Sequence, residues 1–123
     1  MAVTLCIYAV GGTDMVSGLW TVQFEAMGNR GAGVAVFTNG KVLGGDSGFT
    51  YTGTFQEAGD SLKADIWVKN FERSVPSLVG ANEYDLHIEG KLQGDRATGT
   101  ATSTSAALRG NKINFTLIKR EGM

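Results

Sequence analysis

Apolar and polar side chains alternate with a period of two along most of the chain from residue 18 onward, which is the pattern of half-buried β-strands. The clearest example is the segment 62–69, where apolar residues take every second position: Leu62, Ala64, Ile66 and Val68. No long stretch carries a helical period. We therefore predict eight strands, which span residues 18–25, 33–38, 41–44, 49–57, 62–69, 84–93, 96–104 and 113–117.

Turn residues separate these segments. A turn is expected at residues 27–31. Asn39-Gly40 is the strongest short-range signal for a two-residue β-hairpin, because both central positions of a type I′ turn need a positive φ. Gly44-Gly45-Asp46-Ser47-Gly48 then allows another reversal, since glycine accepts a positive φ without steric cost. The residues predicted to shape the turns of this region are Asn39, Gly40, Gly44, Gly45 and Asp46.

Eight strands joined by short turns form a meander, and a meander that closes on itself removes its exposed edges. We therefore predict an all-β fold, an eight-stranded antiparallel up-and-down barrel of the lipocalin or calycin type. Many of the expected inward positions carry small residues: Gly53, Ala64, Gly90, Ala97, Gly99 and Ala101. Such residues either leave room for one small ligand or mark bends where strands coil sharply, and we favour bends.

The 123 residues match the length of one domain. Residues 18–121 are assigned to the barrel. Residues 1–17 are an N-terminal extension, either outside the barrel or an additional strand that docks on the barrel edge or on a partner chain. The formal net charge is −1, and no basic cluster exceeds Lys119-Arg120, so neither nucleic acid nor a membrane is expected as a partner. Cys6 is the single cysteine, so no internal disulfide can form.

Catalytic chemistry finds little support in the sequence. His87 is the single histidine, and it takes an outward strand position between Asp85 and Glu89, where a solvated side chain is expected. No serine lies in a nucleophile-elbow motif, and no His, Cys or carboxylate group has metal-ligand spacing. Residues 28–33 are rich in glycine but predict a hairpin, since no helix follows that could hold phosphate. We expect no catalytic residue, metal or cofactor.

Two groups of residues are candidates for contact with another protein. Large apolar residues lie on the outward register of the fifth strand or in the connection after it: Trp67, Phe71, Val75, Pro76 and Leu78. Exposed apolar groups that lie together suggest an interface, here between two copies of the chain. Alternatively, the connection folds over the barrel mouth and covers them. Glu57 and Asp60 form an acidic turn before the fifth strand, a candidate site for holding a partner.

The barrel interior is a candidate ligand pocket. An uncharged, apolar interior suits a fatty-acyl or aromatic group better than a polar metabolite. The residues expected to line it are Trp20, Phe24, Phe49, Tyr51, Phe55, Ile66, Tyr84, Leu86 and Phe115. For Trp20, the alternative is that the indole plugs one end of the barrel.

Several motifs of the chain together resemble the GrlR family of small bacterial negative regulators of type III secretion gene expression. The motifs are Gly18-Leu-Trp-Thr-Val-Gln-Phe, Gly31-x-Gly-Val, Asn39-Gly40-x-Val-x-Gly44-Gly45-Asp46, Tyr51-x-Gly53 and Val68-Lys-x-Phe71 with Val75-Pro76-Ser77-Leu78. The likeness runs from residue 18 to residue 92, and the Asn-Gly-x-hydrophobic-x-Gly-Gly-Asp element is its most specific part.

This resemblance implies a cytoplasmic, dimeric, lipocalin-like barrel with an apolar interior. It also implies a non-enzymatic function, in which the protein grips a transcriptional activator through consecutive acidic residues in the turn before the fifth strand and keeps it from DNA. This chain departs from that pattern, because its turn reads Gln56-Glu-Ala-Gly-Asp-Ser61 and carries only Glu57 and Asp60. We expect a GrlR-like regulator that forms a homodimer and acts by binding another protein; the alternative is a carrier of an apolar small molecule.

Overall fold

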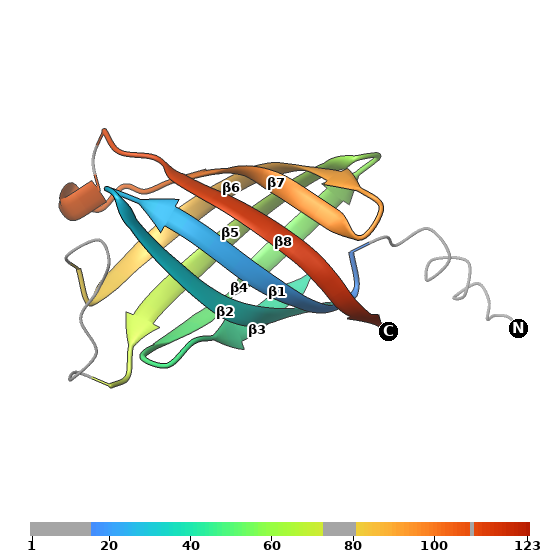
Figure 1. The fold of residues 1–123 in the computed structure, drawn as a ribbon, viewed down its shortest axis with the longest axis horizontal. Helices are drawn as coiled ribbons and strands as arrows, with labels where there is room; N and C mark the ends of the chain where they lie inside the picture. Colours follow the sequence, from blue (N-terminus) through green and yellow to red (C-terminus); the bar gives the residue numbers. More distant parts are fainter. Residues whose placement is uncertain (1–15, 73–80, 109) are drawn as a thin grey trace, which may run out of the picture.

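The computed structural model describes residues 16–72, 81–108 and 110–123, and these form a closed barrel of antiparallel strands (Figure 1). Each strand pairs with its sequence neighbours, and β8 pairs with β1 to close the circle. The strands are β1 (Gly18–Ala26), β2 (Asn29–Thr38), β3 (Lys41–Gly45), β4 (Phe49–Ala58), β5 (Ser61–Asn70), β6 (Glu83–Gln93), β7 (Arg96–Thr102) and β8 (Ile113–Gly122). A short 3₁₀-helix, η1 (Ala106–Leu108), precedes β8. The predicted eight-stranded antiparallel barrel is confirmed.

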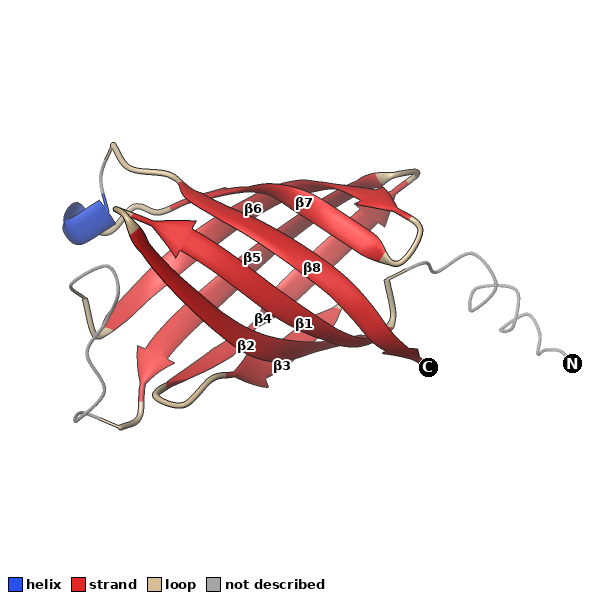
Figure 2. Ribbon diagram, in the orientation of Figure 1, coloured by secondary structure: helices blue, strands red, loops and turns tan. Residues whose placement is uncertain are grey.

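Strands make up nearly all of the described wall (Figure 2), and their alternation determines which side chains face the interior. In β5, every second residue from Leu62 to Asn70 is buried, while the residues between them are exposed. This is the pattern expected when one face of a strand packs on the core and the other meets water. The buried core continues around the barrel through Trp20, Phe37, Val42 and Leu117.

The first hairpin is tighter than the predicted turn at residues 27–31. Met27 and Gly28 are the only residues between β1 and β2, and both have a positive φ, 54° and 81°. The strand β2 therefore begins at Asn29 rather than at residue 33. A two-residue turn with a positive φ at both positions matches the twist of the flanking strands. The alternation did not indicate this part of β2 because it contains small residues and glycines.

The second hairpin has the predicted type I′ geometry, since Asn39 and Gly40 have φ values of 50° and 77°. The next reversal depends on Asp46. One carboxylate oxygen, Oδ1, accepts the backbone N–H groups of Gly48 at 3.0 Å and Phe49 at 2.9 Å. Aspartate commonly stabilises turns by accepting hydrogen bonds from nearby backbone N–H groups. Here the Asp46 turn reverses the chain between β3 and β4.

Among the small inward residues, Gly53 and Gly99 mark close approaches between strands. A Cβ atom added to Gly53 in β4 would overlap the carbonyl oxygen of Asp65 in β5. A Cβ atom added to Gly99 in β7 would overlap the carbonyl oxygen of Glu89 in β6. Both obstacles are backbone atoms, so these glycines let neighbouring strands coil sharply rather than leave space for a ligand.

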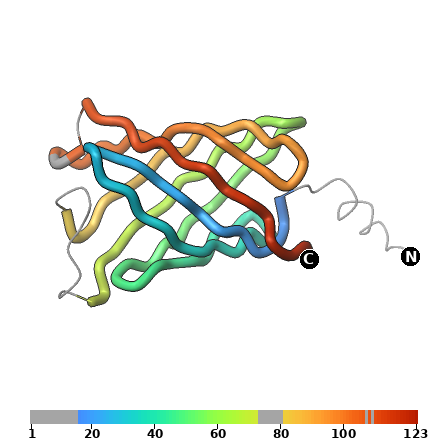
Figure 3. Tube along the Cα trace, in the orientation of Figure 1, coloured from blue at the N-terminus to red at the C-terminus, as the bar shows by residue number. Residues whose placement is uncertain are grey.

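One end of the barrel holds the β4–β5 and β6–β7 turns and the C-terminus (Figure 3). The buried side chain of Trp20, near the start of β1, closes this end. The indole N–H of Trp20 donates a hydrogen bond to the carbonyl oxygen of Val16 at 2.6 Å, and its ring packs edge-on against Phe37. The ammonium group of Lys119 lies 5.6 Å from the centre of the ring. Val16 is fully buried, so the packing of this end includes a residue of the segment assigned to the extension.

The opposite end contains the β1–β2 turn, the Asp46 turn and η1. Leu108 of η1 is buried against Ala26, Ala101 and Ile113. This second hydrophobic cluster lies where β1 and β7 end and where β8 begins. The two ends therefore differ, because a tryptophan closes the first and a short helix packs over part of the second.

Candidate functional site

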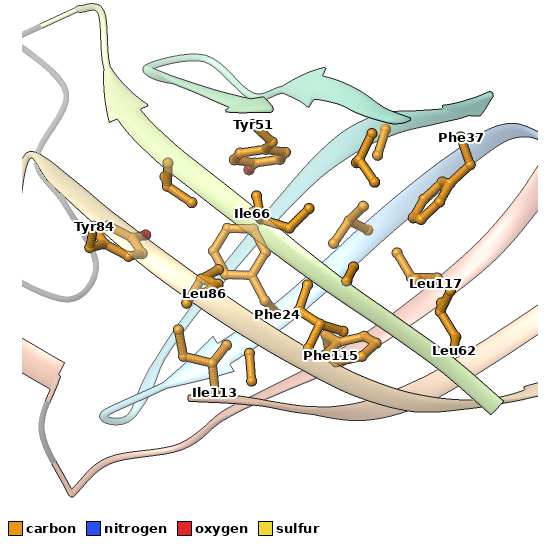
Figure 4. Close-up of a pocket in the computed structure, with 17 residues that line it drawn as sticks. Phe24, Phe37, Tyr51, Leu62, Ile66, Tyr84, Leu86, Ile113, Phe115 and Leu117 are labelled. Atoms are coloured by element: carbon orange, nitrogen blue, oxygen red, sulfur yellow. The ribbon is translucent and has the colours of Figure 1, made fainter. Parts of the chain in front are cut away.

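The barrel encloses a cavity of about 90 Å³ between the two ends. Its walls are apolar except for the hydroxyl groups of Tyr51 and Tyr84, which lie toward the end of the cavity away from Phe37 and Leu62 (Figure 4). The lining residues are Val22, Phe24, Ala35, Phe37, Val42, Tyr51, Leu62, Ala64, Ile66, Val68, Tyr84, Leu86, Ile88, Ala101, Ile113, Phe115 and Leu117. Such a site is shaped for an apolar group.

The structure brings together most of the residues predicted to line the interior. Six of them line the cavity: Phe24, Tyr51, Ile66, Tyr84, Leu86 and Phe115. The other three lie elsewhere. Trp20 closes the barrel end, the ring of Phe55 packs on Phe37 at a centroid distance of 5.2 Å, and Phe49 lines a neighbouring recess. Apart from Ile66 and Leu86, the aliphatic residues of the lining, such as Leu62 and Leu117, were not predicted as pocket residues, although the same alternation places them inward.

A polar cluster of Asp46, Tyr51 and Tyr84 lies beside the cavity. The hydroxyl group of Tyr51 donates a hydrogen bond to Oδ2 of Asp46. Burial, together with the negative charge of Asp46, raises the pKa of Tyr84 to about 12. Burial and the hydrogen bond to Asp46 raise the pKa of Tyr51 as well. Both phenols are therefore neutral at physiological pH, and the carboxylate supplies the charge of the cluster.

Next to this cluster, a recess of about 180 Å³ opens between β2 and β4. It forms because β3 has five residues and pairs with β2 only from Val34 to Thr38, while residues 29–33 pair with β1 alone in the described chain. Arg30 and Ala32 line one side of the recess, and the Asp46 turn lines the other. Phe24, Tyr51, Val68 and Tyr84 line both the recess and the cavity. The two spaces are therefore neighbours that share walls.

The outer surface carries a row of side chains that crosses five strands, which we call the outer row. Each member opposes the next one on the neighbouring strand: Leu19, Val36, Leu43, Thr52 and Trp67. Leu19 is 39% exposed, Leu43 is 49% exposed and Trp67 is 47% exposed. Side chains that are directly opposite on one sheet face are in reach of one another. The row therefore joins separate exposed apolar residues into one surface band.

Two of the residues predicted for an interface can be placed. Trp67 is on the outer row, and Phe71, which directly follows β5, is 60% exposed. The backbone N–H of Phe71 donates to the carbonyl oxygen of Gly48, so the end of β5 is tied to the Asp46 turn. Val75, Pro76 and Leu78 lie outside the described residues. The alternative that their connection covers the barrel mouth also concerns residues outside the described part of the chain.

His87 is held between two carboxylates on the outer face. Its Nδ1 lies 2.7 Å from Asp65 and its Nε2 lies 2.9 Å from Asp85. The hydrogen bond with Asp65, opposed by partial desolvation, raises the pKa of His87. Partial burial acts to raise the pKa of Asp85, but hydrogen bonds from Thr104 and Ser103 outweigh it and lower this pKa to about 2. The arrangement favours a charged imidazolium with both ring nitrogens donating.

The outward position of His87 was predicted, but its partnership with Asp65 was missed. Asp65 opposes His87 across the β5–β6 pair, and 22 positions separate them in the sequence. Only the pairing register of these strands brings the two side chains together. The flanking position of Asp85 was visible in the sequence, whereas its hydrogen bonds to Thr104 and Ser103 depend on how the segment after β7 folds.

The two acidic residues predicted to hold a partner lie at the Trp20 end of the barrel. Asp60 is in the β4–β5 turn, and its Oδ2 lies 3.7 Å from the ammonium group of Lys91. Glu57 is the penultimate residue of β4 and opposes Leu62. The charge of Asp60 is thus partly balanced within the chain, which leaves this turn less acidic than its sequence indicates.

Within the residues that the structure describes, no group of three or more His, Cys, Asp or Glu side chains has the arrangement to hold a metal ion. No helix in this part of the chain has the length and apolarity needed to cross a membrane.

A closed antiparallel barrel with an apolar interior places this chain among the small β-barrel proteins of lipocalin-like architecture. No protein-family model matches the chain, and no curated protein matches it either. The fold is therefore established by the structure, and function has to be argued from the cavity and the outer surface.

Proposed function

We propose that this chain is a non-enzymatic regulatory protein of the GrlR type that acts by binding other proteins. The observation that carries the proposal is the outer row, in which Leu19, Leu43 and Trp67 are all substantially exposed on alternate strands, β1, β3 and β5, with Val36 and Thr52 between them. Large apolar groups that gather on one face of a protein mark interaction sites more often than isolated ones do. Tryptophan is also among the residues that contribute most to the energy of interfaces.

The occupant proposed for the outer row is a second copy of the chain. In a twofold dimer the same patch serves both partners, and a band that crosses several strands can lie against its own copy. The formal charge of −1 produces little repulsion between copies. Charges of both signs lie on the strands around Trp67, since Lys69 pairs with Glu83 at 3.8 Å and Asp65 lies two residues before Trp67. Two rotated copies can therefore oppose unlike charges.

Sedimentation velocity over a range of concentrations tests this interface with the variants Trp67→Ser and Met27→Ser. Met27 is 50% exposed but lies in the β1–β2 turn, off the outer row, so it is a control of matched exposure. We expect a dimer for the wild type and for Met27→Ser, and a monomer for Trp67→Ser. A dimer of unchanged strength in Trp67→Ser would overturn the assignment of the outer row.

The regulated partner implied by the resemblance is a transcriptional activator, and the consequence implied is negative control of transcription. The acidic turn is the proposed contact, with Glu57 and Asp60 as its two carboxylates. Transcript levels in a strain that lacks the gene, complemented with wild type or with Glu57→Lys and Asp60→Lys combined, test this. We expect repression to be lost in the double variant and kept in Glu89→Lys, which reverses an exposed charge on β6. Equal repression by both variants would exclude the acidic turn.

The cavity supports a second candidate function, the binding of a small apolar molecule inside the barrel. Its volume of about 90 Å³ is well below the several hundred Å³ of sites for drug-sized ligands. Dry apolar cavities of roughly 150 Å³ hold benzene or xenon, so the guest that fits is small, and a fatty-acyl chain requires the walls to move. Native mass spectrometry of the protein purified from its host tests for a retained molecule at one per barrel. Binding by the barrel is contradicted if neither a retained guest nor an added small apolar probe is detected.

A further inference from the structure

We propose that the recess between β2 and β4 holds the polar end of a guest whose apolar part lies in the cavity, and that Asp46 selects a neutral or cationic polar end over a carboxylate. This inference rests on the second candidate function, the binding of an apolar guest within the barrel. It adds the place where the guest is oriented and the chemistry that the site accepts.

The shared walls carry the first step of the argument. The cavity is apolar along its length, but its boundary with the recess contains both tyrosine hydroxyl groups. On the recess side, the lining adds Arg30, Asp46 and Ser47 to those hydroxyl groups. An elongated guest in these two spaces therefore meets apolar side chains at one end and polar side chains at the other, which is how most small-molecule sites fix orientation.

The hydrogen-bonding inventory shows what the polar end can do. Asp46 already accepts three hydrogen bonds, from Gly48, Phe49 and Tyr51. The hydroxyl group of Tyr51 is therefore used as a donor, and its oxygen remains an acceptor. The hydroxyl group of Tyr84 donates to no described residue, so a guest can accept from it. A hydroxyl or amide group on the guest can both donate to Tyr51 and accept from Tyr84.

Charge distinguishes the kinds of polar end. Asp46 is the negative group that contributes, after burial, to the raised pKa of both tyrosines, so its charge is felt where the polar end of the guest would lie. A second carboxylate at this position would be repelled and would also lose its hydration. Arg30 is the cation that lines the recess, but its side chain is 85% exposed and pairs with Glu25 at 3.2 Å. Screening by water reduces what Arg30 can offer to an anion.

Three six-carbon probes whose polar ends are neutral, cationic and anionic test the proposal: hexan-1-ol, hexylamine and hexanoate at pH 7. Methyl chemical shifts of Ala35, Ala64 and Ile66, which line the cavity, report binding and tolerate weak affinity. We expect hexan-1-ol and hexylamine to bind about tenfold more tightly than hexanoate, a difference that one unfavourable charge contact readily produces.

The variant Asp46→Asn keeps an oxygen that can accept from the two backbone N–H groups but removes the negative charge. In it, the preference against hexanoate should fall to about twofold or less. The control is Asp60→Asn, which removes one negative charge at the other end of the barrel, and there the preference should be unchanged. Unfolding curves in urea show whether each variant is folded. Tyr84→Phe is the second variant. It should weaken the binding of hexan-1-ol without strengthening the binding of hexanoate.

The outcomes separate this inference from the function on which it rests. Binding of hexanoate as tight as that of hexan-1-ol would refute selection by Asp46 while leaving the cavity as a binding site. A preference that persists unchanged in folded Asp46→Asn and in Tyr84→Phe would also refute it. If none of the three probes shifts the cavity methyl resonances, both the inference and the second candidate function are wrong.

Discussion

Replacement of Gly53 by alanine tests whether the small inward residues allow tight strand packing. The alanine Cβ would overlap the carbonyl oxygen of Asp65 and lie 2.9 Å from the Cα of Ile66. Both atoms belong to the backbone of β5, so no side chain can rotate away to make room. Because Gly53 opposes Ile66 in the ladder, β4 and β5 have to separate at this position.

The cost of this separation follows from three contributions. Extra atoms in a well-packed region cost about 1–3 kcal/mol, and one weakened ladder hydrogen bond adds about 1 kcal/mol. Alanine also restricts the unfolded chain more than glycine does, which offsets about 0.4–1 kcal/mol of this. We therefore expect Gly53→Ala to lower the free energy of unfolding by about 1–3 kcal/mol, a large part of the stability of a small domain.

Urea unfolding followed by tryptophan fluorescence measures the change. The midpoint should fall by about 1 M with an unchanged slope, since m is about 1–3 kcal/mol/M for small proteins. Gly122→Ala is the control, because a Cβ atom at Gly122 meets nothing within 4 Å and no left-handed φ is required there. That variant should lie within about 0.5 kcal/mol of the wild type. If Gly53→Ala is as stable as the control, there is room for a side chain at this position and the explanation of Gly53 by strand coiling is refuted.

Two further predictions concern stability. Trp20→Phe removes the donor to the buried carbonyl of Val16 and should lower the free energy of unfolding by about 1–3 kcal/mol in the same assay; an unchanged midpoint would contradict the role of this hydrogen bond. The pKa of His87 is raised from 6.5 in the folded state, so its stabilisation is fully present below pH 6.5 and is lost as the pH rises through the folded pKa. Wild-type stability should therefore decline relative to His87→Gln as the pH rises above 6.5, by a small amount because the ring is half exposed; parallel profiles would show that Asp65 and Asp85 do not stabilise the imidazolium.

The alternation along the chain predicted the strands because each strand has one solvent-exposed face and one buried face. β5 shows this best, and its predicted span of 62–69 lies within the observed Ser61–Asn70. The pattern failed where both faces carry small or polar residues, as at the start of β2. It also understated β8, which continues to Gly122, because the last residues of this strand are polar and exposed. Hydrophobic patterning indicates the buried faces of strands, and it gives no signal where a strand extends beyond the core.

The candidate sites depend on register, and register was available from the sequence only across tight turns. A two-residue turn determines which residues oppose each other along the whole hairpin. The β4–β5 turn therefore sets Thr52 opposite Trp67, and this part of the outer row follows from the sequence once the turn is identified. No tight turn joins β5 to β6, since residues 71–82 separate them, so the pairing of Asp65 with His87 could not be derived. The recess could not be derived for a different reason, because the β2–β3 turn sets the register of its hairpin but does not determine where β3 stops pairing with β2. Local turn chemistry thus defines each hairpin, whereas a site that spans two hairpins is set by the closure of the barrel.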